Sequence, residues 1–138
     1  MKVSILIPLF FILSGCMSTP TYSPKSILKD NSAYLKADSE HAHGIFQALD
    51  QRLYITSING IAAGDFFKWY PEDALINSGL TEVEVDYFYG QISSEGCVKF
   101  LAKKDERYII RKQLDGWKVK YWVEIEDGEK VLNLPCDA

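Results

Sequence analysis

Residues 82–89 read EVEVDYFY, a stretch in which two kinds of side chain alternate along the chain. Successive side chains of a β-strand point to opposite faces, so this alternation predicts a strand with one buried side and one solvent-facing side. The expected buried side carries Val83, Val85, Tyr87 and Tyr89, and the other side carries Glu82, Glu84, Asp86 and Phe88. A strand buried on one face only is typical of an antiparallel sheet that packs against a core.

Similar segments lie on both sides of this strand and are separated by short turn signals. The expected strands are 33–37, 52–58, 82–89, 97–102, 107–113, 117–126 and 130–134. Asn-Gly at 59–60 and Asp-Gly at 115–116 and 127–128 are turn-forming pairs. Short helices are expected at 44–51 and 73–78. Seven short strands with little helix predict an all-β fold, a small antiparallel β-sandwich.

The 117–126 strand is expected to bury one face of large side chains. That face would hold Trp117, Val119, Tyr121, Val123 and Ile125. Trp122 lies on the opposite, charged face, as Phe88 does in its own strand. If these two charged faces meet, Phe88 and Trp122 form one apolar docking site for a partner; otherwise they belong to a second layer of the core.

The first fifteen residues predict a signal peptide. Lys2 precedes an apolar run from Val3 to Leu13, which is shorter than the roughly 20 residues that a membrane-spanning helix needs. Leu13-Ser14-Gly15-Cys16 resembles the bacterial lipobox. The resemblance implies cleavage before Cys16, a diacylglycerol thioether on that cysteine, and an acyl chain such as palmitate on the new N-terminus. The alternative is ordinary secretion with a coincidental cysteine.

The lipobox resemblance also implies a location. The residue after Cys16 is Met17 and not Asp, which in the enteric sorting rule favours the outer membrane, with the protein facing the periplasm. Residues 16–31 are rich in Ser, Thr and Pro, and are predicted to be a flexible linker that reaches at most about 50 Å. The acidic body, residues 32–138, would hang from this linker away from an anionic membrane surface.

The body resembles a group of small bacterial lipoproteins with a PEGA-like or transthyretin-like sandwich of unassigned function. The resemblance rests on RLYITSINGIAAG at 52–64, INSGLTEVEVDY at 76–87, and VKFLAKKDERYII at 98–110 followed by YWVEIEDGEKV at 121–131. The departures fall on turn residues. Asn59 stands where Asp is commoner, Ser78 replaces Pro, and a usual Gly is missing near Asp105. The resemblance implies a location and a fold, and no activity.

Two cysteines remain if Cys16 is lipidated. Cys97 and Cys136 would lie in an oxidising compartment, where a disulfide between them is favoured over two free thiols. Such a bridge would attach the end of the chain to the sheet.

His41 and His43 are the candidate metal ligands, because two imidazoles on one face of a strand can hold Zn²⁺ or Cu²⁺. No third ligand stands at a recognisable spacing, so the sequence favours a polar loop that happens to contain two histidines. The spacings of nucleophilic, phosphate-binding and metalloprotease motifs are missing, so the sequence predicts neither catalysis nor a cofactor. Asp65, Glu72 and Asp73, with Trp69, are the candidates for weak glycan hydrolysis or sensing. The net charge of −4, with both signs interspersed, argues against nucleic acid as a partner.

Trp69 and Tyr70 belong to an aromatic segment between two expected strands. They either cover one end of the core or form an exposed patch for a protein or a glycan. The sequence thus predicts a lipid-anchored envelope protein that acts as a non-enzymatic binding or structural module. Its expected contacts with another envelope protein or cell-wall glycan are Trp69, Tyr70, Phe88 and Trp122. A small periplasmic metal-binding protein, built on the two histidines, is the alternative.

Overall fold

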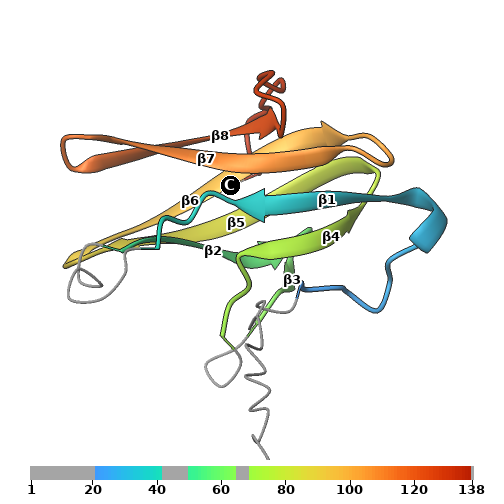
Figure 1. Cartoon of the computed structure of the whole chain (residues 1–138), viewed down its shortest axis with the longest axis horizontal. Helices are drawn as coiled ribbons and strands as arrows, with labels where there is room; N and C mark the ends of the chain where they lie inside the picture. The colour runs from blue at the N-terminus through green and yellow to red at the C-terminus, as the bar shows by residue number, and fades with distance from the viewer. Residues whose placement is uncertain (1–20, 42–49, 65–68, 138) are drawn as a thin grey trace, which may run out of the picture.

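The computed structural model describes residues 21–41, 50–64 and 69–137, and these residues form two packed sheets (Figure 1). The strands are β1 (Ser32–Ala37), β2 (Gln51–Ile58), β3 (Ile61–Ala62), β4 (Asp73–Asn77), β5 (Gly79–Tyr89), β6 (Ile92–Ala102), β7 (Arg107–Asp115) and β8 (Lys118–Ile125). One sheet, here the β1 sheet, has the order β4-β1-β7-β8, and the other, the β5 sheet, has the order β3-β2-β5-β6. The predicted small all-β sandwich is confirmed. One pair, β1 with β7, is parallel.

The core lies between the two sheets and follows the predicted alternation. Val83, Val85 and Tyr87 of β5 are completely buried, and Tyr89 packs at the margin of the core. The β1 sheet contributes Leu35, Ala74, Ile76, Tyr108, Ile110 and Val123 to the same core. The strand that the sequence placed at 82–89 begins three residues earlier, at Gly79, and pairs with β6 over its whole length.

The segment after Pro71 is a strand and not the short helix expected at 73–78. Ala74 and Ile76 are buried, and their backbones pair with Leu35 and Ala33 of β1. A helix of six residues would not place these two side chains on one face, whereas a strand does. Of the other expected helix, 44–51, residues 44–49 lie outside the described residues, and Gln51 begins β2.

Two predictions near the end of the chain are also wrong. Trp117 is 90% exposed, because it occupies the turn between β7 and β8 together with Gly116, whose φ is +65°. Residues 130–134 form no strand. Lys130 makes an isolated bridge to Glu124 of β8, and Leu134 makes one to Lys99 of β6. These residues therefore run from one sheet to the other and cannot pair continuously with either.

The last described residues, 130–137, thus form a strap across the side of the sandwich where β8 and β6 are the edge strands. The amide of Val131 donates to the carbonyl of Val123, and the amide of Leu134 donates to that of Lys99. Cys136 is bonded to Cys97 of β6, so the predicted disulfide is present. The strap covers backbone groups that would otherwise leave both edges open to pairing with another chain.

The opposite side of the sandwich, where β4 and β3 are the edges, is covered by residues 21–31. Tyr22 bridges to Ala74 of β4, and its hydroxyl donates to the carbonyl of Ala62 in β3 over 3.3 Å. Farther along, the amide of Leu28 donates to Asn77 over 3.0 Å, and a 3₁₀ turn, η1 (Lys29–Asn31), leads into β1. This part of the expected linker is therefore attached to the sandwich by backbone and side-chain hydrogen bonds.

Candidate functional site

The outer face of the β5 sheet combines carboxylates with aromatic rings. We call it the acidic face and define it by Tyr54, Tyr70, Glu84, Asp86, Phe88 and Glu95. The strand register places Asp86 of β5 between Tyr54 of β2 and Glu95 of β6. A hollow of about 480 Å³ lies over this face and is lined by Thr56, Tyr70, Glu84, Asp86, Glu95 and Cys97 among others. A second hollow, of about 370 Å³, adjoins it beside Phe88.

Negative charge accumulates on the acidic face, although Arg52 of β2 lies opposite Phe88 on the same face. In the described ranges, none of the side chains of Glu84, Asp86 and Glu95 forms an ion pair, although Glu84 accepts a hydrogen bond from the Ser57 hydroxyl over 2.7 Å. Partial burial raises the pKa of Asp86, and the negative charges of Glu95 and Glu84 raise it further. A cation that entered the hollow would relieve this repulsion.

Aromatic rings border the same carboxylates. The rings of Tyr54 and Phe88 lie 6.0 Å apart between centroids, at an interplanar angle of 60°. Phe88 is 43% exposed, and Tyr70 is half-buried at the wall of the larger hollow. Rings next to carboxylates suit a basic side chain, whose stem packs on the ring while its charge meets the acid.

The structure brings two of the four predicted contact residues, Tyr70 and Phe88, to the acidic face. Trp69 is 91% exposed in the connection from β3 to β4. Trp122 lies on the outer face of the β1 sheet, so Phe88 and Trp122 point away from opposite sides of the molecule and form no common docking site. The sequence did not reveal Tyr54 and Glu95, because their place beside Asp86 depends on the pairing of three strands.

Trp122 is held in a polar contact of its own. Its indole N–H donates to Glu124 over 2.7 Å, and the ammonium of Lys130 lies 5.3 Å from the ring centroid. The hydrogen bond from Trp122, together with one from Arg111, lowers the pKa of Glu124. These contacts fix the ring against the outer face of the β1 sheet.

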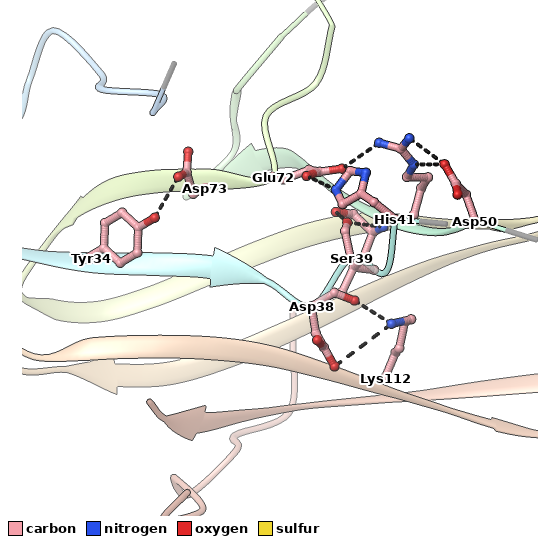
Figure 2. A network of polar contacts seen from close by, with 10 residues as sticks. Tyr34, Asp38, Ser39, His41, Asp50, Glu72, Asp73 and Lys112 are labelled. Carbon is pink, nitrogen blue, oxygen red and sulfur yellow. Dashed lines mark hydrogen bonds and ion pairs between the residues drawn. The ribbon is translucent and has the colours of Figure 1, made fainter. Parts of the chain in front are cut away.

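A second cluster of polar side chains lies where β1 ends and β2 begins (Figure 2). His41 Nε2 lies 2.8 Å from one oxygen of Glu72, and the Arg52 guanidinium lies 3.4 Å from the other oxygen. Arg52 also pairs with Asp50. A metal ion at His41 would have to compete with this arginine for the Glu72 carboxylate. His43 lies outside the described residues, so the predicted histidine pair stays a prediction.

The same cluster continues to Lys112 of β7, whose side chain is only 3% exposed. Its ammonium donates to the backbone carbonyl of Asp38 (Figure 2) and lies 3.5 Å from Glu40. The hydroxyl of Ser39 accepts from the amide of Leu53 over 2.8 Å and donates to its carbonyl over 2.9 Å. These contacts join β1, β2 and β7, and give the cluster a structural role.

The candidate carboxylates for hydrolysis are separated by their partners. Glu72 is paired with His41 and Arg52, whereas Asp73 accepts a hydrogen bond from the Tyr34 hydroxyl over 2.6 Å (Figure 2). Burial raises the pKa of Tyr34 to about 12, with a further contribution from its bond to Asp73. Asp65, the third candidate, lies outside the described residues, so the predicted trio stays a prediction.

Metal-binding atoms also gather near the disulfide. In the described part of the chain, Glu82, Cys97 and Cys136 form the group whose ligand atoms lie within 4.8 Å of one another. Both sulfur atoms are used in the disulfide, and Glu82 pairs with Lys99 over 3.1 Å. This group therefore stabilises the strap.

No protein family, curated protein or solved structure matches this chain. Cys16 lies outside the described residues, and in those that are described no helix is long and apolar enough to cross a membrane.

Proposed function

We propose that this chain is a lipid-anchored protein of the bacterial cell envelope that acts as a non-enzymatic binding module through the acidic face. The lipobox-like Leu13-Ser14-Gly15-Cys16 after a short apolar run supports the anchor, and Met17 directly after it supports the outer-membrane location. The Cys97–Cys136 disulfide fits an oxidising compartment. The observation that carries the binding role is a set of carboxylates that form no ion pair within the described residues and lie beside the partly exposed rings of Tyr54 and Phe88.

The partner that this surface fits best is a basic segment of another envelope protein. Complementary charge raises the rate of encounter and excludes partners of like charge, and a Phe or Tyr ring provides the apolar contact that retains the partner. A neutral cell-wall glycan would use the rings but would leave the repulsion among Glu84, Asp86 and Glu95 in place. The charge of the face therefore favours the protein partner over the glycan.

The anchor is tested by the intact mass of the protein extracted from membranes, with Cys16→Ser as the control. A chain that begins at Cys16 and carries a diacylglycerol and an acyl chain is the expected result. An unmodified chain, cleaved at another position, would contradict the anchor and would leave an ordinary secreted domain.

The binding face is tested by crosslinking the anchored protein in cells and comparing substitutions on the two outer faces. Phe88→Ala and Asp86→Asn are each expected to lower the affinity for the partner about tenfold, which corresponds to a lost contact of roughly 1.4 kcal/mol, and to lower the yield of the specific crosslink accordingly. Trp122→Ala, on the opposite outer face, is the matched control and is expected to retain it. High salt should weaken the crosslink. A crosslink that is lost with Trp122→Ala and kept with both other variants would move the binding surface to the β1 sheet.

A further inference from the structure

Thr21 and Tyr22, the first described residues, lie on the side of the sandwich where β3 and β4 are the edge strands. The amide of Tyr22 donates to the carbonyl of Asp73 over 3.0 Å, and the amide of Leu75 donates back to the carbonyl of Tyr22 over 2.8 Å. The Thr21 hydroxyl also donates to the Asp73 carboxylate over 3.3 Å. The chain is therefore fixed to the sandwich from residue 21 onward.

This attachment limits how far the sandwich can stand from a lipid at Cys16. Only residues 17–20 separate Cys16 from Thr21, and a fully extended chain spans about 18 Å over these five steps. That distance is about a third of the reach expected for a linker that continued to residue 31. A headgroup layer is itself several ångströms thick, so an anchored sandwich would be held next to the lipid surface.

The surface that surrounds this attachment point carries exposed apolar and basic side chains. We call it the N-terminal edge and define it as residues 21–29, β3 and residues 69–72. The amide of Ile55 donates to the carbonyl of Pro71, and that of Ala37 donates to the carbonyl of Glu72, so residues 69–72 run along the same side of the sandwich as β3. Figure 1 shows this side at the bottom of the view.

Three large apolar side chains of the N-terminal edge are exposed: Leu28 by 63%, Ile61 by 58% and Trp69 by 91%. Lys25 and Lys29 are also exposed and stand near Leu28 in the sequence. Apolar side chains together with lysines are the composition that binds an anionic lipid interface, and tryptophan is enriched at the headgroup level.

We propose that the N-terminal edge lies on the lipid surface, with Leu28, Ile61 and Trp69 among the headgroups and the two lysines near anionic lipids. This inference rests on the proposed lipid at Cys16, because the short connection is what brings the edge to the membrane. The sandwich then has a fixed orientation. The edge formed by β3 and β4 faces the bilayer, and β8 with the strap lies on the side turned away from it.

Depth-dependent quenching tests the orientation in the full acylated protein. The protein is reconstituted in vesicles of phosphatidylethanolamine and phosphatidylglycerol whose acyl chains are partly brominated. One variant keeps only Trp69 (Trp117→Phe, Trp122→Phe), and the matched control keeps only Trp117 (Trp69→Phe, Trp122→Phe). Trp69 fluorescence is expected to fall at least about twofold relative to vesicles without bromine, and Trp117, in the turn between β7 and β8, is expected to stay unchanged.

A further pair of substitutions checks that the edge makes the contact. Ile61→Asp in the variant that keeps only Trp69 is expected to reduce the quenching, whereas Leu132→Asp, at a still more exposed leucine of the strap, is expected to leave it unchanged. The intact mass of each preparation is measured first. A protein without lipid overturns both the anchor and the orientation. An acylated protein whose Trp69 is not quenched overturns the orientation and leaves the anchor standing. Trp69 fluorescence that follows the protein density instead of the brominated lipid indicates a second copy on this edge, and also overturns the proposal.

Discussion

Gly96 of β6 lies directly below the ring of Tyr121 from the other sheet. A Cβ atom built at Gly96 would come within 2.2 Å of the Tyr121 ring, far inside any van der Waals contact. The Tyr121 hydroxyl donates to the carbonyl of Ser94 over 3.1 Å, which fixes the ring in this position. The spacing of the two sheets at this point therefore depends on the absence of one side chain.

We expect Gly96→Ala to lower the free energy of unfolding by about 1–3 kcal/mol, because the added methyl group overfills a packed contact. Urea unfolding followed by circular dichroism measures the change. The control is the same substitution in a Tyr121→Leu background, where the ring is absent and the added cost should fall below about 0.5 kcal/mol. Equal costs in both backgrounds would show that the strain arises in the β6 backbone and not at the ring.

Single residues also explain where the sequence was a good guide and where it was not. Asn59 and Gly60 have positive φ angles of 51° and 75°, which is the geometry that an Asn-Gly hairpin requires, so this turn was predictable. The turn near residue 105 lacks the glycine that is usual in the lipoprotein group that the chain resembles. Asp105 adopts a φ of +62° there, so an aspartate occupies the left-handed position of that turn. Trp117 was misplaced because the turn uses Gly116 and Trp117, one residue later than Asp-Gly suggests.

At the scale of elements, the pairing of β5 with β6 places Asp86 directly opposite Glu95. Like charges in such cross-strand pairs destabilise a sheet. The raised pKa of Asp86 means that the folded protein holds this proton more tightly than the unfolded chain does. The contribution of Asp86 to stability is therefore fully present at acidic pH, and is lost as the pH rises through the raised pKa.

We expect Asp86→Asn to raise the free energy of unfolding at neutral pH by a few tenths to about 1 kcal/mol, since it removes the repulsion from Glu95. The gain should shrink as the pH falls and wild-type Asp86 takes up its proton. Urea unfolding at a series of pH values measures it, with Glu129→Gln, at an exposed carboxylate away from the acidic face, as the control. A gain that is independent of pH would place its origin outside the carboxylate charge. A variant that is more stable and binds less well would fit a surface kept for binding at some cost in stability.

Strands were predictable where apolar and polar side chains alternate over many positions, and less so where they alternate over few. Residues 82–89 alternate between buried and outward-facing side chains through eight positions, and all eight lie in β5, which begins three residues earlier. Residues 73–77 have only two buried positions, Ala74 and Ile76, and their pairing with β1 depends on contacts more than thirty residues away. The acidic face was hidden for the same reason. Its carboxylates were visible in the sequence, but the register that brings Tyr54, Asp86 and Glu95 side by side was not.

At the scale of the whole molecule, the two open sides of the sandwich are covered by segments that come before β1 and after β8. The sequence indicated the disulfide and its attachment of the chain end to a sheet. It did not indicate a connection between the two sheets, because a strand was expected at 130–134. The strap instead crosses from β8 to β6, and Lys99 holds it further through an ion pair with Asp137 over 2.6 Å. The disulfide therefore connects the two sheets as well as two points of the chain.

We expect Cys136→Ser to lower the free energy of unfolding by about 2–4 kcal/mol. The bridge spans 39 residues, for which the chain-entropy model gives roughly 4 kcal/mol as an upper figure. Urea unfolding without reductant measures the loss. Cys97→Ser and the double variant should cost about the same as Cys136→Ser, because each removes the same bond. Single variants as stable as the wild type, or a thiol count that does not change on reduction, would contradict a bridge in the native protein.

The strap also has a consequence for the order in which the molecule folds. Residues 130–137 follow β6 and β8 in the chain, so both edges stay uncovered in any folding intermediate in which the strap has not yet docked. Exposed edges pair readily with other strands, so two chains at this stage of folding can join. A product that stops before Lys130 would retain both edges for its lifetime, and is expected to be a substrate for proteases and chaperones even though nearly all of its core residues are present.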